Sequence, residues 1–78
     1  MKIVKVLGSG CKRCSDTAAL MQQTADRLGV QVVIEKVTGD ADIASFGIAA
    51  TPGIVIDGRV VHAGGLPKPD DIERWLAA

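Results

Sequence analysis

The order of apolar patterns in residues 2–37 constrains the fold of this chain more than any other feature. A β-branched run, KIVKVL (Lys2–Leu7), ends at a glycine-rich break. A helical pattern follows over Lys12–Leu28, and Gly29 is suited to end that helix. Residues 30–37 form a second β-branched run. Strand, helix and strand in this order predict a parallel strand pair joined by a right-handed crossover.

The later apolar runs predict an antiparallel hairpin between two helices. GIVI (Gly53–Ile56) and RVVHA (Arg59–Ala63) flank Asp57-Gly58, a dipeptide typical of a two-residue type I′ turn. The predicted fold is therefore α/β with the order βαβαββα, a four-stranded mixed sheet flanked by three helices that cover both of its faces. The two remaining helical patterns are residues 41–46, with Asp40 as N-cap, and residues 69–76 (PDDIERWL).

Composition excludes several classes of protein. The chain has 78 residues, enough for a single domain over residues 1–78. Basic and acidic residues balance at nine each and aromatic residues are scarce, so no nucleic-acid partner is expected. No segment reaches the roughly 20 apolar residues that cross a membrane. The start, MKIVKVLGSG, has no signal-peptide pattern, so we expect a cytoplasmic protein without membrane partners.

Both cysteines, Cys11 and Cys14, lie between the first predicted strand and the first predicted helix. Amide N–H groups in the first turn of a helix lack partners within the helix and favour an anion, which lowers the pKa of the Cys11 thiol. Lys12 and Arg13 add two cations with the same effect. Cys14 follows at the i+3 spacing that brings two side chains together. The pair is therefore interpreted as redox-active, with Cys11 as the exposed nucleophile and Cys14 as the buried resolving thiol.

Two other roles for this pair are less favoured. A structural disulfide across so short a loop would constrain little of the unfolded chain, and cytoplasmic thiols stay mostly reduced. A zinc site would need two further ligands. His62 is the only histidine and is interpreted as a half-exposed strand residue, so no metal site is expected.

The second candidate feature is Thr51-Pro52, directly before the GIVI strand. In the predicted topology this strand starts beside the end of the antiparallel first strand, so Thr51 and Pro52 would face the cysteine pair. Proline can simply start the strand here. A cis bond would instead turn the Thr51 backbone toward an extended substrate peptide. The sequence leaves the isomer open.

Together these motifs resemble the thioredoxin superfamily, and in particular its small redox-active disulfide proteins. The resemblance covers essentially the whole chain and rests on GSGCKRC, ATPG, DGRVVHAGG and PDDIERWL. It implies thiol–disulfide exchange without a cofactor, with Pro52 as a cis-proline beside the cysteines. It also implies a disulfide-containing protein substrate and a reductase or dithiol as electron donor. Gly64 and Gly65 match a glycine pair that lets substrate backbone approach, although a turn that ends the strand explains them equally well.

These expectations together predict that the protein is a monomeric oxidoreductase with a small apolar surface on which the substrate docks. The cations in the CxxC interior would bias this surface toward acidic partners. The expected substrate-binding residues are Gly10, Lys12, Arg13, Thr51, Pro52, Gly64 and Gly65.

A soft-metal chaperone is the alternative function. Small ferredoxin-like copper chaperones also place CxxC between a first strand and a first helix, and thiolates at this spacing bind Cu(I) well. Three features argue against this class. Ser9-Gly10 stand where that family usually carries a methionine, the chain ends in a predicted helix rather than a strand, and the family has no use for Thr51-Pro52 ahead of a hairpin.

Overall fold

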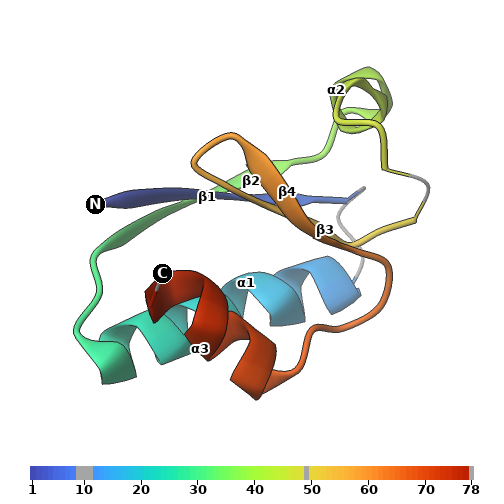
Figure 1. The fold of residues 1–78 in the computed structure, drawn as a ribbon. Helices are drawn as coiled ribbons and strands as arrows, with labels where there is room; N and C mark the ends of the chain where they lie inside the picture. The colour runs from blue at the N-terminus through green and yellow to red at the C-terminus, as the bar shows by residue number, and fades with distance from the viewer. Residues whose placement is uncertain (9–11, 49, 78) are drawn as a thin grey trace.

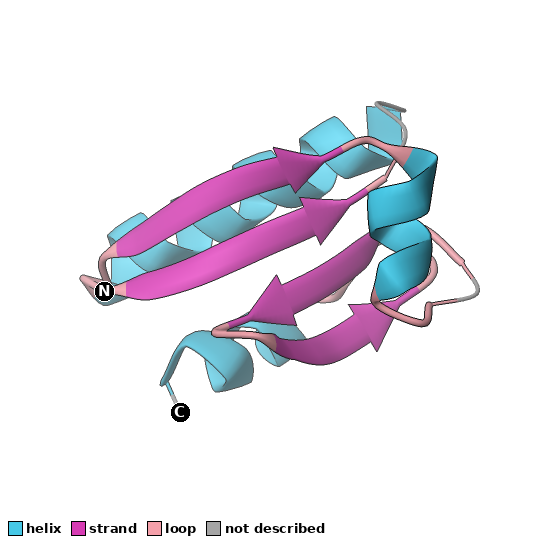
Figure 2. Ribbon diagram, turned by 90° about the horizontal axis from the view of Figure 1, so that it is seen from above, coloured by secondary structure: helices cyan, strands magenta, loops and turns pink. Residues whose placement is uncertain are grey.

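The chain folds into a mixed β-sheet with helices on both of its faces. The computed structural model describes residues 1–8, 12–48 and 50–77. The order of helices and strands confirms the predicted βαβαββα fold (Figures 1 and 2). Within these residues the elements are β1 (Lys2–Leu7), α1 (Lys12–Leu28), β2 (Val32–Val37), α2 (Asp40–Ser45), β3 (Gly53–Ile56), β4 (Arg59–Ala63) and α3 (Pro69–Ala77).

The sheet has the strand order β2-β1-β3-β4. β1 pairs with β2 in parallel, and α1 supplies the long crossover that a parallel pair needs. β3 runs antiparallel to β1, with Leu7 opposite Gly53, and β4 continues the sheet as the second strand of a hairpin. The end of β1 and the start of β3 therefore lie side by side.

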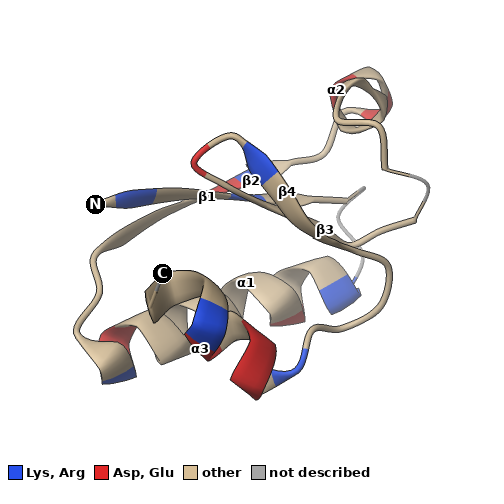
Figure 3. Cartoon of the chain, in the orientation of Figure 1, with Lys and Arg blue, Asp and Glu red and all other residues tan. Residues whose placement is uncertain are grey.

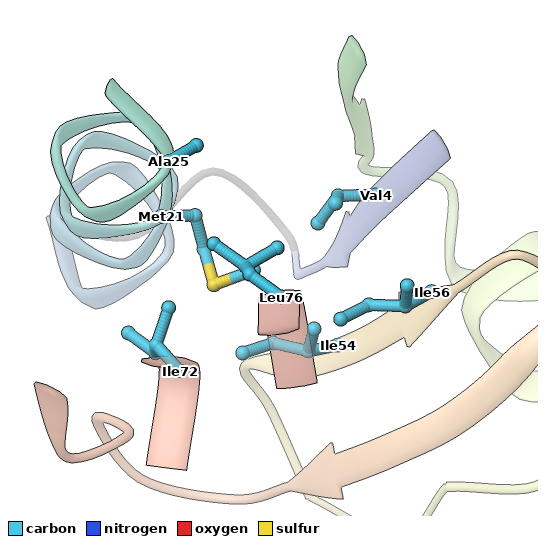
Figure 4. Packing of buried hydrophobic residues seen from close by; sticks show 7 residues of the cluster. All are labelled: Val4, Met21, Ala25, Ile54, Ile56, Ile72 and Leu76. Carbon is cyan, nitrogen blue, oxygen red and sulfur yellow. The ribbon is translucent and has the colours of Figure 1, made fainter. Parts of the chain in front are cut away.

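The main core lies between the sheet and the two helices α1 and α3 (Figure 1). α2 packs on the opposite face, where Ile43 meets Leu7 and Val55 and partly buried Phe46 packs against them. Trp75 is also partly buried and packs against the main core, so both aromatic residues are core residues. Figure 4 shows the side chains of the main core, which are Val4, Met21, Ala25, Ile54, Ile56, Ile72 and Leu76.

The end of α1 explains why β2 is shorter than predicted. Gly29 has a φ of 71°, as expected for the residue after a helix, and its N–H donates to the Asp26 carbonyl. The N–H of Val30 donates to the Ala25 carbonyl at 2.9 Å, which completes a Schellman motif. Val30 therefore belongs to the helix end, and β2 begins only at Val32, opposite Lys2.

The predicted N-cap of α2 is wrong by one residue. Gly39 occupies the N-cap position with extended backbone, and no side chain caps the helix there. Asp40 is instead the first helical residue. Its carboxylate, with that of Asp42, lies in the first turn, where a negative charge interacts favourably with the helix dipole.

The β3–β4 hairpin has the predicted turn and an unpredicted bulge. Asp57 and Gly58 both have positive φ, 49° and 84°, as a type I′ turn requires. Further along, Val55 pairs with Val60 but Ile54 pairs with His62, so Val61 is an extra residue in β4. Because of this bulge, Val61 and His62 both reach the side of the sheet that α3 covers: Val61 packs against the main core, and the His62 ring lies 5.7 Å from that of Trp75.

Ile54→Ala is expected to lower the free energy of unfolding by about 3 kcal/mol, because Ile54 is fully buried in the main core and its truncation leaves a cavity. Urea denaturation measures the change. Ile3→Ala is the matched control, since Ile3 lies on the neighbouring strand with 46% of its surface exposed. Equal losses in the two variants would contradict the assignment of the core.

Candidate active site

Cys14 lies in the first turn of α1 with its side chain buried, at 5% exposure. It packs against Val6 of β1 and Ala18 of α1. Gly8 follows the last residue of β1, and its N–H donates to the Val37 carbonyl of β2 at 2.9 Å. This bond holds the backbone of Gly8 at the end of the sheet, directly beside the first turn of α1. The buried position agrees with the one expected for a resolving thiol.

Gly8 makes room for the sulfur of Cys14. A Cβ atom built on Gly8 would lie 2.0 Å from Cys14 Sγ and 3.2 Å from Cys14 Cβ. No pair of non-bonded atoms tolerates the first of these distances, so any side chain at this position would displace the sulfur. Gly8 is thus a site residue, whereas its place in the sequence predicts only a break at the end of a strand. The sequence contains no direct indication of this role, because it depends on how closely β1 approaches α1.

Thr51 and Pro52 lie next to the same point, as the topology predicted. Leu7 pairs with Gly53, so the chain just before β3 runs past the chain just after β1. The Cβ of Thr51 lies 3.9 Å from the position that a Gly8 Cβ would occupy. The Thr51–Pro52 peptide bond is cis, Pro52 is buried and Thr51 is exposed. Cys14, Gly8 and Thr51 therefore form one continuous cluster.

Gly64 and Gly65 join this cluster from the end of β4. Both have positive φ, 89° and 73°, which supports their interpretation as a turn that ends the strand. The N–H of Gly64 donates to the Pro52 carbonyl at 2.9 Å, and a Cβ on Gly64 would lie 3.1 Å from that of Ala50. The turn is thus fastened to the segment that contains Thr51 and Pro52, with its backbone close to that segment.

His62 supports this turn from the side of α3. Its Nε2 lies 3.0 Å from the Gly65 carbonyl oxygen, and its ring packs against Trp75. This agrees with a partly buried strand residue. Among residues 1–8, 12–48 and 50–77, no three His, Cys, Asp or Glu side chains gather where they could hold a metal ion.

The remaining predicted site residues fall into two groups. Lys12 and Arg13 are exposed at the start of α1 and directly precede buried Cys14 in the sequence. The first turn of α1 contains no acidic residue that would offset their charge. Gly10 and Cys11 lie outside the described residues.

Known proteins with related sequences identify the family of this chain. A family model described as a thioredoxin domain matches residues 2–77. The chain belongs to the thioredoxin family. It is 30% identical to a thioredoxin of Methanocaldococcus jannaschii over 76 residues, which is 97% of this chain and 87% of that protein. It is 25% identical to a thioredoxin of Methanothermobacter thermautotrophicus over 77 residues, which is 99% of this chain and all of that protein.

Membership of the thioredoxin family confirms two of the expectations from the sequence. The chain is a thioredoxin-like disulfide oxidoreductase, and its sheet and helices have the arrangement expected for that fold. None of the helices in the described part of the chain combines the length and the apolar character needed to cross a membrane.

Proposed function

We propose that this thioredoxin-family protein reduces or exchanges disulfides through Cys11 and Cys14. The observation that carries the proposal is the buried sulfur of Cys14 in the first turn of α1, beside Gly8 and the Thr51-Pro52 segment. A buried thiol at this place is out of reach of a protein disulfide. It is suited to attack the sulfur of Cys11, its neighbour in the CxxC sequence, once that sulfur is bonded to the substrate.

The reaction proceeds in two exchange steps. The Cys11 thiolate attacks one sulfur of the substrate disulfide, a mixed disulfide forms, and the other substrate sulfur leaves as a thiolate. The Cys14 thiolate then attacks the Cys11 sulfur and releases the second substrate thiolate, which takes up a proton. Two electrons have passed to the substrate, and Cys11 and Cys14 share a disulfide. A dithiol or a reductase then returns the pair to the reduced state.

The surface around Cys14 suggests how a substrate is held. An extended substrate peptide would pair with the backbone of exposed Thr51, in the manner of an added strand. The glycine turn after β4 lies beside this segment and leaves room for the peptide, and Gly10 would complete the surface. Lys12 and Arg13, both exposed, would favour substrates with acidic residues near the disulfide.

We also propose a substrate class, an electron donor and a location for this reaction. The substrate is a disulfide-containing protein or a small disulfide, and the electron donor is a thioredoxin-reductase-like enzyme or a dithiol. The protein acts in the cytoplasm as a single-domain monomer. The copper-chaperone alternative expects a chain that ends in a strand, whereas α3 is the last element of the described residues. Disulfide turnover with weak Cu(I) binding would support the redox function, whereas tight Cu(I) binding with negligible turnover would support the chaperone function.

Cys14→Ser is expected to trap the mixed disulfide, because the variant keeps the attacking thiol but lacks the thiol that releases the substrate. Incubation with a short peptide that contains one intramolecular disulfide should raise the mass of the protein by that of the peptide, and dithiothreitol should reverse the change. Ser15→Ala is the matched control, since Ser15 is exposed beside Cys14 and its variant should turn over the peptide without accumulating an adduct.

The double variant Cys11→Ser/Cys14→Ser shows which sulfur holds the substrate. It should form no adduct under the same conditions. If Cys14→Ser fails to accumulate an adduct although its circular dichroism spectrum matches that of the wild type, the assignment of Cys14 as the resolving thiol is wrong.

A further inference from the structure

A cavity of about 380 Å³ lies at the end of the sheet away from Cys14. It is bounded by the start of β1, the β3–β4 hairpin and the C-terminal part of α3. Figure 1 shows this hairpin above α3. The first turn of α1, which contains Cys14, lies at the opposite end of α1 from the loop that leads into β2. The volume of the cavity falls in the range of about 300–1,000 Å³ that is typical of small-molecule sites. The redox reaction proposed above does not use this cavity.

The walls of the cavity combine an apolar part with a cationic part. Ile56, Val61 and the indole of Trp75 supply the apolar surface. Arg59 from β4 and Arg74 from α3 supply positive charge, and Lys2 adds a third basic side chain. Figure 3 shows basic segments at the start of β1, on β4 and on α3, around this end of the molecule. Recognition by an aromatic face and guanidinium groups suits a ligand with a flat ring and an anionic group.

The charges of the cavity are not fully matched by neighbouring groups. Arg74 is paired with Asp71 on its own helix. Asp57 is the acidic residue in the lining, and its Oδ1 accepts a hydrogen bond from the Ile3 N–H at 3.0 Å, which holds that carboxylate at the hairpin turn. Arg59 is exposed and forms no ion pair with any residue that the structure describes. Its guanidinium is therefore available to an anion.

The bulge in β4 adds one residue to the apolar wall of the cavity. The extra residue at this position is Val61, which packs against the main core beside Trp75 and also lines the cavity. The ring of His62, the next residue, lies 5.7 Å from the Trp75 ring and is tilted by 48° to it. The indole is thus supported by His62 while it also lines the cavity. Bulges commonly re-aim side chains next to functional sites.

We propose that this cavity binds a small organic anion that carries an aromatic ring. The ring would pack on Trp75, Val61 and Ile56, and the anionic group, a phosphate or a carboxylate, would accept hydrogen bonds from Arg59 with Arg74 nearby. This site is separate from the cysteine pair, so binding does not depend on the redox function.

Phenyl phosphate is the probe, and Trp75 reports its binding directly. Trp75 is the only tryptophan and the chain has no tyrosine, so tryptophan fluorescence comes from the wall of the cavity alone. Titration of the full chain should give a saturable change in fluorescence. Inorganic phosphate should bind at least about tenfold more weakly, because it buries no apolar surface. Benzylamine, with the same ring and a positive charge, should give no saturable change.

Arg59→Gln should weaken phenyl phosphate binding by about tenfold, because it removes the guanidinium and its charge-assisted hydrogen bond while keeping a polar side chain with the same first three carbon atoms. Lys36→Gln is the matched control: Lys36 is an exposed basic residue on β2, outside the lining of the cavity, and its variant should bind as the wild type does. Backbone amide shifts in nuclear magnetic resonance spectra should change at the hairpin and the end of α3. Insulin reduction by Arg59→Gln should equal that of the wild type.

Four outcomes would overturn the proposal. These are no saturable binding of phenyl phosphate, unchanged affinity in Arg59→Gln, equal affinity for benzylamine, or amide shifts that gather around Cys14 and Thr51 instead of the hairpin. Since binding is read from Trp75, a protein that binds the probe but fails to reduce insulin would contradict the proposed function and leave this site intact.

Discussion

Cys11→Ser is expected to reduce disulfide turnover to the uncatalysed background. A serine hydroxyl stays protonated near neutral pH and is a far weaker nucleophile toward sulfur than a thiolate, so no mixed disulfide can form. Cys14 cannot replace it, because this residue is only 5% exposed and its sulfur lies against the backbone of Gly8. The rate of insulin reduction with dithiothreitol as electron donor measures the effect.

The control for this variant is its stability. A serine differs from cysteine by one atom, so urea denaturation of the reduced proteins should show similar midpoints, and the loss of activity then reports the missing thiolate. A Cys11→Ser protein that keeps substantial turnover would show that Cys14 or another group performs the attack. The roles assigned to the two cysteines would then have to be abandoned.

Gly8→Ala is expected to impair disulfide exchange strongly and to destabilise the fold by about 1–3 kcal/mol. The added Cβ would lie 2.0 Å from Cys14 Sγ, so the sulfur must rotate away or α1 must move from β1. Either response shifts the resolving thiol from the position next to Thr51. The measurements are the insulin reduction rate and the free energy of unfolding in urea.

Gly39→Ala is the matched control for this substitution. Gly39 also has a negative φ, −73°, and its added Cβ would meet only the flexible carboxylate of Asp42 at 3.1 Å. Activity should remain unchanged there. In addition, Gly8→Ala should cost less stability in a Cys14→Ala background, where the clashing sulfur is absent. Equal costs in the two backgrounds would show that the contact between Gly8 and Cys14 does not cause the effect.

The candidate site shows how far local patterns could be used. The position of Cys14 in a first helical turn followed from a strand pattern, a glycine break and a helical pattern. The approach of Thr51 to this turn followed from topology, because an antiparallel third strand must start where the first one ends. The requirement for Gly8 was missed, since it results from a distance between two elements and leaves no pattern in the sequence.

The cavity beside α3 illustrates the same limit. Arg59, Val61 and Trp75 are ordinary strand and helix residues in the sequence. They meet because β4 contains a bulge that brings both Val61 and His62 to the α3 side. A regular strand would have placed neighbouring side chains on opposite faces of the sheet. The bulge cannot be recognised in RVVHA, which reads as an uninterrupted strand.

The sequence by itself determined the order of helices and strands, the type I′ turn at Asp57-Gly58 and the placement of Cys14 at the start of a helix. These features follow from interactions within short segments, such as periodic apolar faces and glycine at positive φ. Tertiary structure alone decided the cis state of the Thr51–Pro52 bond, the space that Gly8 leaves for sulfur and the cavity around Trp75. Each of these depends on how closely separate segments pack, and that distance is set by the whole core.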